Sequence, residues 1–284
     1  PMENVGPFLN IAKLLHGLGF STPAVLAEDR EHGLLLLEDL GDDTYTRLLR
    51  KGHDERALYE LATDALIEVR RRVPADAVGK LPAFDVARCL REVSLVLDWY
   101  WPAIKGGDAP APVRTEFEQA WRSVLPNLWA AGQTITLFDF HVDNLLLLPE
   151  RAGFKACGLL DFQDAIAGPV PFDLASLLED VRRNVPPALA TAMIDRYLAG
   201  NPELSRADFL TAYAASAAQR NTRIVGTFAR LLRRDNKPAY QGYMPRVWEL
   251  LEQDIAHPAM APVADWFARH LPKADRRPLI DLKK

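Results

Sequence analysis

Three oxygen-bearing side chains stand at the ends of short apolar runs in the middle of this 284-residue chain. Asp139 follows one run, Asn144 comes five residues later at the start of a second, and Asp161 ends a third. Magnesium takes hard oxygen donors and usually binds few protein ligands besides phosphate oxygens, so Asn144 and Asp161 are candidate ligands. A carboxylate at Asp139 can then accept or orient a substrate hydroxyl while the metal neutralises a phosphoryl group.

A purely structural interpretation of the same residues is also open. Asp139 can be a loop carboxylate that caps a turn, and Asn144 and Asp161 can be hydrogen-bonded polar residues at strand ends. Asp143, within the same stretch, is expected to be a loop residue rather than a second base.

The elements that must position these residues follow from the hydrophobic pattern. We expect strands at 134–138, 145–148 and 154–160, with a turn at 149–153. An amphipathic helix at 7–18 and a hairpin precede them. The hairpin strands are expected at 24–26 and 34–37. The remaining expected helices are 54–72, 84–100, 113–130, 172–183, 187–199, 205–232, 244–256 and 260–270.

This order predicts an α+β protein, mostly helical, in which one small β element carries the polar residues. The charged stretch at 38–43 interrupts the pattern after the hairpin. We therefore expect a small N-terminal piece, residues 1–40, and a larger helical domain, residues 41–284.

Composition narrows the class of partner. The chain is 49% hydrophobic and 25% charged. Because its net charge is −4, it has no general electrostatic attraction to nucleic acid or to anionic membranes. We expect a nucleotide or small-molecule partner and, by default, a monomer. Two cysteines, Cys89 and Cys157, suggest neither a disulfide framework nor a zinc site. No signal-like segment or apolar run of about 18 residues occurs, so a cytoplasmic protein is expected.

Four segments resemble known motifs. Residues 137–144, Leu-Phe-Asp-Phe-His-Val-Asp-Asn, and residues 159–164, Leu-Leu-Asp-Phe-Gln-Asp, are similar to a catalytic loop, His-x-Asp-x4-Asn, and a metal-binding strand end. Residues 168–175 match the pattern Gly-x4-Asp-Leu-Ala, and residues 35–41 resemble a strand and interlobe hinge. The family with these motifs in this order is the kinase-like phosphotransferases, which include the aminoglycoside and choline kinases.

The resemblance implies a protein-kinase-like two-lobe fold, in which residues 1–40 are the remnant of a small N-lobe with its hinge and residues 41–284 form the C-lobe. It implies ATP as phosphoryl donor and Mg²⁺ as cofactor. Asp139 would be the catalytic residue, Asn144 and Asp161 the metal ligands, and Asp173 a structural support that ties down the catalytic-loop backbone. The hinge residues, whose backbone would meet adenine, are Glu38, Asp39 and Leu40.

Within that family the chain most resembles the bacterial cell-wall-recycling kinases that phosphorylate the anomeric hydroxyl of N-acetylmuramate and N-acetylglucosamine. The stretches that carry this resemblance are 139–145, 161–165, 219–221 with 226–231, and 257–258 with 262–263. It implies a sugar 1-phosphate as product. The candidate substrate contacts are His141, Asp164, Arg220 and Asn221. Each also has a structural alternative, as loop scaffold, loop cap or buried ion pair.

Two departures from the family pattern bear on activity. Leu137 stands where the family commonly has His, and no glycine-rich loop or strand Lys precedes the helix at 7–18. We expect that several dozen residues are missing from the start of this sequence.

Two alternative functions are open: a pseudokinase that acts as a binding module, and a kinase of an aminoglycoside or another amino alcohol. The Arg-rich composition of 187–257 favours a neutral or anionic substrate.

Overall fold

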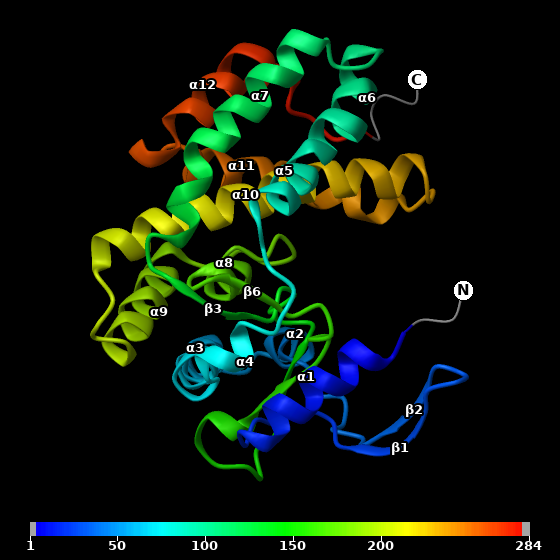
Figure 1. Ribbon diagram of the computed structural model, residues 1–284, viewed down its shortest axis with the longest axis vertical. Helices are drawn as coiled ribbons and strands as arrows, with labels where there is room; N and C mark the ends of the chain where they lie inside the picture. The colour runs from blue at the N-terminus through cyan, green and yellow to red at the C-terminus, as the bar shows by residue number, and fades with distance from the viewer. Residues whose placement is uncertain (1–3, 280–284) are drawn as a thin grey trace. The chain divides into compact units, whose positions relative to one another are not determined.

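The computed structural model describes residues 4–279. The chain divides into two compact units, shown element by element in Figure 1. The first consists of Pro1–Ala83, Gln133–Asp180 and Val185–Ser205, and the second of Phe84–Gly132, Val181–Asn184 and Arg206–Lys284. The predicted α+β class, mostly helical with small sheets, is confirmed. The functional division at residue 40 stays a prediction.

The first unit begins with the expected helix and hairpin. Helix α1 (Gly6–Gly17) has Pro7 in its first turn and a buried apolar face. Gly19 follows with φ of 86°, a conformation that Gly adopts without steric cost. Strands β1 (Val25–Asp29) and β2 (Leu34–Leu37) pair in antiparallel fashion, which confirms the hairpin.

Three helices follow the hairpin in the first unit: α2 (Tyr45–Arg50), α3 (Glu55–Arg72) and α4 (Ala75–Val78). Side chains cap the first two, because Thr44 accepts a hydrogen bond from the Arg47 N–H and Asp54 accepts one from the Ala57 N–H. The prediction of a helix at 54–72 is confirmed.

Two small antiparallel sheets lie in the middle of the chain. Strand β3 (Gln133–Thr136) pairs with β6 (Ile166–Pro169), and β4 (Leu145–Leu147) pairs with β5 (Cys157–Leu159). The expected strand at 154–160 is wrong in its first half, because Gly153–Ala156 form a turn of 3₁₀ helix. Strand β6 escaped the sequence reasoning because its Gly-Pro pair is typical of loops. Gly168 is required there, since a Cβ would lie only 2.5 Å from the Thr136 Oγ1.

The first unit closes with α8 (Phe172–Leu178) and α9 (Pro187–Gly200), both of which contact α3. The prediction of a helix to residue 183 is wrong, because the backbone leaves the helical region at Glu179 (φ −112°, ψ 34°). The local sequence after Glu179 still favours a helix, but the tertiary structure around this segment overrides that preference.

The second unit is a bundle around one long helix, α10 (Arg206–Arg233), which packs against α5 (Val86–Leu95) and α11 (Met244–Ile255) (Figure 1). The expected helix at 84–100 continues as a π-helical turn, Val96–Tyr100, before α6 (Trp101–Lys105). Pro102 lacks the N–H that an α-helical hydrogen bond requires, which explains why the regular ladder shifts before it.

Helices α7 (Ala111–Val124) and α12 (Ala261–His270) pack together in the same unit. Helix α7 ends before 130, as Pro126 turns the chain into the 3₁₀ segment Leu125–Trp129. No helix in residues 4–279 is both long enough and apolar enough to cross a membrane.

Candidate functional site

The site begins with the loop that follows β3, residues 137–144. Both oxygens of the Asp173 carboxylate accept backbone hydrogen bonds from this loop, from the Leu137 N–H at 2.6 Å and from the Phe138 N–H at 3.0 Å. Asp173 lies in the first turn of α8 and is 5% exposed. Hydrogen bonds to a buried carboxylate are stronger than neutral ones, so α8 fixes the start of the loop.

Phe138 has a left-handed backbone conformation immediately before Asp139, with φ of 77°. A bulky residue reaches this region only at a cost of about 1–3 kcal/mol, and such strain gathers at functional sites. The Phe138 ring stacks on Phe172 with centroids 5.5 Å apart and an interplanar angle of 6°. The stack and the bonds to Asp173 hold the strained residue, and Asp139 follows it, half-buried.

Asn144 joins the loop to the strand end that carries Asp161. Its side-chain Nδ2 donates to the Asp139 backbone oxygen at 3.0 Å and to the Asp161 Oδ2 at 3.2 Å. Its backbone donates to the His141 carbonyl at 2.9 Å and accepts from the Leu160 N–H at 2.9 Å. The structure therefore brings Asp139, Asn144 and Asp161, the three residues that open the sequence argument, into one cluster.

Asp161 is exposed and has a left-handed backbone, with φ of 57°. The next residue, Phe162, is 1% exposed and stacks on Phe8 of α1 with ring centroids 5.0 Å apart. Two residues on, the Gln163 Nε2 donates to the Asp161 Oδ1 at 2.5 Å. Each oxygen of this carboxylate thus has its own amide donor, since Asn144 bonds the other.

The donor set suits magnesium. Asn144 and Asp161 present an amide and a carboxylate within hydrogen-bond distance of each other, so one cation can reach both. An amide in this position turns either its nitrogen or its oxygen toward its neighbour, and a cation favours the oxygen. Among residues 4–279 no three His, Cys, Asp or Glu side chains gather as a metal cluster. A cation here would therefore need phosphate or water oxygens as well.

Two predicted substrate contacts lie beside this cluster in sequence. His141 is 8% exposed, and its Nε2 lies 3.4 Å from the Asn144 Nδ2. Asp164 is exposed. Their roles as substrate contacts stay predictions.

The expected hinge follows β2. The Glu38 N–H donates to the Ala24 carbonyl at 2.8 Å, and its carboxylate accepts from the Ala24 N–H at 3.0 Å and pairs with Arg151 at 3.0 Å. Asp39 accepts from the Gly41 N–H at 2.8 Å, and Leu40 is half-buried. These bonds brace the segment, while adenine binding by its backbone stays a prediction.

The other two predicted contacts, Arg220 and Asn221, lie on α10 in the second unit and are buried at 4% and 0% exposed. The Asn221 Nδ2 donates to the Asp254 Oδ2 at 2.8 Å. Two residues before Asn221, the Gln219 Nε2 donates to the Glu92 Oε2 at 3.0 Å. The amides of Gln219 and Asn221 thus donate to acceptors within their own unit, and the substrate role of Arg220 and Asn221 stays a prediction.

Sequence reasoning missed one brace of the loop. The Thr46 hydroxyl donates a short hydrogen bond to the Asp143 Oδ1, and the Thr46 N–H donates to the Val142 carbonyl at 3.2 Å. The Asp43 carbonyl accepts from the Leu147 N–H at 3.0 Å. No local signal reveals these contacts, because Thr46 and Asp143 are 97 positions apart.

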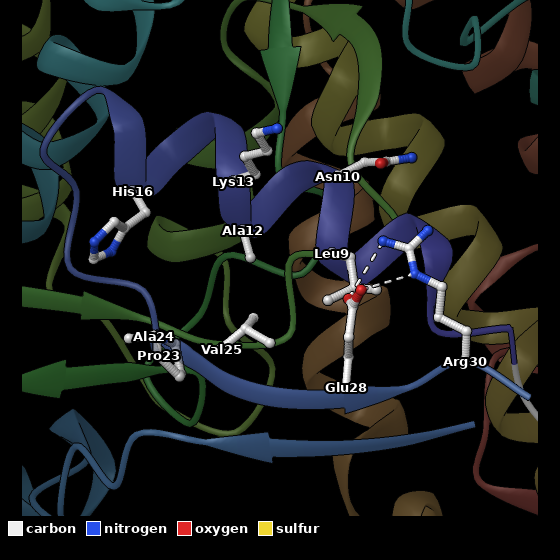
Figure 2. A pocket seen from close by; sticks show the side chains of 10 residues that line it. All are labelled: Leu9, Asn10, Ala12, Lys13, His16, Pro23, Ala24, Val25, Glu28 and Arg30. Atoms are coloured by element: carbon white, nitrogen blue, oxygen red, sulfur yellow. Dashed lines mark hydrogen bonds and ion pairs between the residues drawn. The ribbon is translucent and has the colours of Figure 1, made fainter. Parts of the chain in front are cut away.

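A cavity of about 410 Å³ lies between α1 and β1 in the first unit. Figure 2 shows Leu9, Ala12 and Val25 facing its interior, with Glu28 and Arg30 paired at one end. Its lining shares no residue with the cluster of Asp139, Asn144 and Asp161.

Comparisons with known proteins bear on this arrangement. The sequence model described as the phosphotransferase enzyme family matches residues 1–210. The N-acetylmuramate/N-acetylglucosamine kinase of Caulobacter vibrioides is 39% identical over 280 residues, which cover 96% of this chain and 77% of the relative. The kinase of the same name from Pseudomonas aeruginosa is 34% identical, covering 94% of this chain and 79% of the relative.

Solved structures share the fold. A choline/ethanolamine kinase family protein from Mesorhizobium loti superposes with a TM-score of 0.62 at 14% identity, covering 93% of this chain and 84% of that one. The GDP complex of aminoglycoside 2'-phosphotransferase-IIIa gives a TM-score of 0.59 at 16% identity, covering 89% and 82%. The expected protein-kinase-like fold is thereby confirmed.

Proposed function

Because the chain belongs to the phosphotransferase enzyme family, we propose that it transfers the terminal phosphoryl group of ATP to the anomeric hydroxyl of N-acetylmuramate or N-acetylglucosamine. The product is the sugar 1-phosphate, and the activity fits the recycling of cell-wall amino sugars. One observation carries the proposal: four relatives, 31–39% identical over 88–96% of this chain, are all named as kinases of these two sugars. Solved aminoglycoside and choline kinases share only 12–17% identity, so they support the fold and not their own substrates.

Asp139 is the residue that meets the acceptor hydroxyl. Its position is set by the strained backbone at Phe138 and by the carboxylate of Asp173 behind the loop. An anomeric hydroxyl is more acidic than an ordinary alcohol, so Asp139 has less need to remove its proton than to orient it. Correct orientation alone lowers the barrier, because it aligns the attacking oxygen with the phosphoryl group.

Asn144 and Asp161 would hold Mg²⁺, for which their donor set is suited. The cation, when bound, neutralises charge on the phosphate groups during transfer. The hinge residues Glu38, Asp39 and Leu40 would receive the adenine. We expect the protein to act in the cytoplasm, where ATP is available, and by default as a monomer.

We propose His141 and Asp164 of the first unit as contacts of the sugar. Arg220 and Asn221 of the second unit are proposed as substrate residues on the chemistry of their side chains alone. A guanidinium suits the lactyl carboxylate of N-acetylmuramate, which N-acetylglucosamine lacks. Arg220→Gln should therefore raise the KM for N-acetylmuramate more than that for N-acetylglucosamine.

The test is a coupled ADP-release assay on a panel of N-acetylmuramate, N-acetylglucosamine, kanamycin and choline. We expect turnover of the amino sugars, and its loss in Asp139→Asn with an unchanged melting temperature. Asp76→Asn is the matched control, because Asp76 is an exposed carboxylate that forms an ion pair with the exposed Lys80. Phosphorylation of kanamycin or choline alone would refute the substrate class. Absence of any Mg-ATP-induced rise in melting temperature would favour a pseudokinase.

A further inference from the structure

We propose that Gln163 is a positioning residue for the metal-binding carboxylate of Asp161, and that its amide sets the affinity of the site for a divalent cation. The inference rests on the proposed function of Asp161 as a metal ligand. It starts from the hydrogen bond at 2.5 Å between the Gln163 Nε2 and the Asp161 Oδ1.

The position of Asp161 explains why its carboxylate needs hydrogen bonds to fix its orientation. Its own backbone lies in the left-handed region, and because the side chain is exposed, burial does not fix the orientation of the carboxylate. Two amides hold it, with Asn144 on Oδ2 at 3.2 Å and Gln163 on Oδ1 at 2.5 Å. A carboxylate that accepts a hydrogen bond at each oxygen has little freedom to rotate, and a metal ligand held in this way is preorganised.

The two donors are not equivalent once a cation is present. Asn144 is itself a candidate ligand, and an amide that turns its oxygen toward a cation cannot keep its nitrogen directed at the neighbouring carboxylate. Gln163 has no such second task in the site. It is therefore the donor that can remain on Asp161 when the cation is bound.

Gln163 is itself held in place. The preceding residue, Phe162, is buried and stacked on Phe8, and its carbonyl accepts a hydrogen bond from the Ala165 N–H at 3.1 Å. The turn is thus anchored on both sides of Gln163, at Phe162 before it and at Ala165 after it. The amide reaches the carboxylate across two residues without crossing to another element.

The chain offers a matched control in the same unit. The Gln133 Nε2 also donates a hydrogen bond, at 3.1 Å, but its acceptor is the backbone carbonyl of Ala167. Replacing either Gln by Met keeps the length of the side chain and removes the donor. Only the Gln163→Met change removes a donor from the metal-binding carboxylate.

The experiment measures Mn²⁺ binding to the full-length protein in the presence of ADP and without sugar, by the loss of the free Mn²⁺ signal in electron paramagnetic resonance. We expect Gln163→Met to weaken Mn²⁺ binding about tenfold, the lower end of the effect of residues that support metal ligands. In turnover assays the Mg²⁺ concentration for half-maximal rate should rise by a similar factor, while kcat at saturating Mg²⁺ stays near that of the wild type. Gln133→Met should leave both quantities unchanged.

An Mn²⁺ affinity within twofold of the wild type in Gln163→Met overturns the inference. A raised KM for the sugar at unchanged Mn²⁺ affinity also overturns it, since Gln163 would then act on the substrate. If Gln163→Met does not fold, Gln163→Asn gives the same comparison, because the shorter amide falls short of Asp161. Mn²⁺ binding is measured without turnover, so failure of the wild type to phosphorylate any sugar would refute the proposed function and leave this test standing.

Discussion

Replacing Asp173 by Asn should destabilise the protein and disorder the start of the loop at 137–144. The carboxylate accepts from two backbone N–H groups, of Leu137 and Phe138, at 2.6 and 3.0 Å, and it is 5% exposed. An Asn side chain has one oxygen and one NH₂ group. One backbone N–H therefore keeps a neutral acceptor, and the other faces a second donor in a buried place.

The magnitude follows from those two bonds. A hydrogen bond to a charged group contributes about 1.5–3 kcal/mol, and a buried unsatisfied donor costs about 1–3 kcal/mol, so we expect a loss of about 3 kcal/mol in the free energy of unfolding. For a chain of this size the melting temperature should fall by about 6–12 °C. Because Phe138 can then relax from its left-handed conformation, kcat should fall more than the loss of folded protein explains.

Urea denaturation followed by circular dichroism measures the stability, and turnover under conditions where the variant is fully folded measures the second effect. Asp76→Asn is the control, since it makes the same change at an exposed carboxylate whose pair with Lys80 is solvated. A stability of Asp173→Asn within about 0.5 kcal/mol of the wild type, the range usual for substitutions at the surface, would refute the reasoning.

Gly226→Ala should destabilise by about 1–3 kcal/mol in thermal denaturation, because its Cβ would collide with the backbone of Leu95, whereas Gly17→Ala, with open space around its site, should be neutral or stabilising. A harmless Gly226→Ala would contradict the close packing. Burial raises the pKa of the Cys157 thiol from 9.0 to about 12, and it raises that of Cys89 also. Both thiols should therefore resist Ellman's reagent at pH 8 until the chain unfolds. Because the pKa of Cys157 is higher in the folded protein, the contribution of the buried thiol to the free energy of unfolding is complete below pH 9.0 and declines as the pH rises toward 12.

Much of the fold, and the grouping of Asp139, Asn144 and Asp161, could be predicted because the signals in the sequence are local. The loop at 137–144 and the strand end at 159–164 are contiguous motifs, and the family that they indicate is confirmed. The hairpin is bounded by turn residues, and its apolar runs are clear. The β6 strand was hidden by its Gly-Pro pair, whose fit depends on Thr136 across the sheet.

What could not be predicted depends on contacts between distant positions. The hydrogen bond from Thr46 to Asp143 joins residues 97 positions apart, and neither residue type signals such a contact in its local sequence. The left-handed conformation of Phe138 contradicts the preference of a bulky side chain, and only the surroundings of the loop sustain it. Gln163 lies inside a motif, but only coordinates reveal which atom its amide meets.

The position of the phosphate on the product tests the central claim most directly. The full-length protein is incubated with Mg-ATP and N-acetylmuramate, and the purified product is examined by proton and phosphorus NMR and by a reducing-end assay. We predict that the anomeric proton couples to phosphorus and that the reducing end is lost in the wild type, with no product from Asp139→Asn. A phosphorylated sugar that keeps its reducing end, or product from Asp139→Asn at the wild-type rate, would contradict the account.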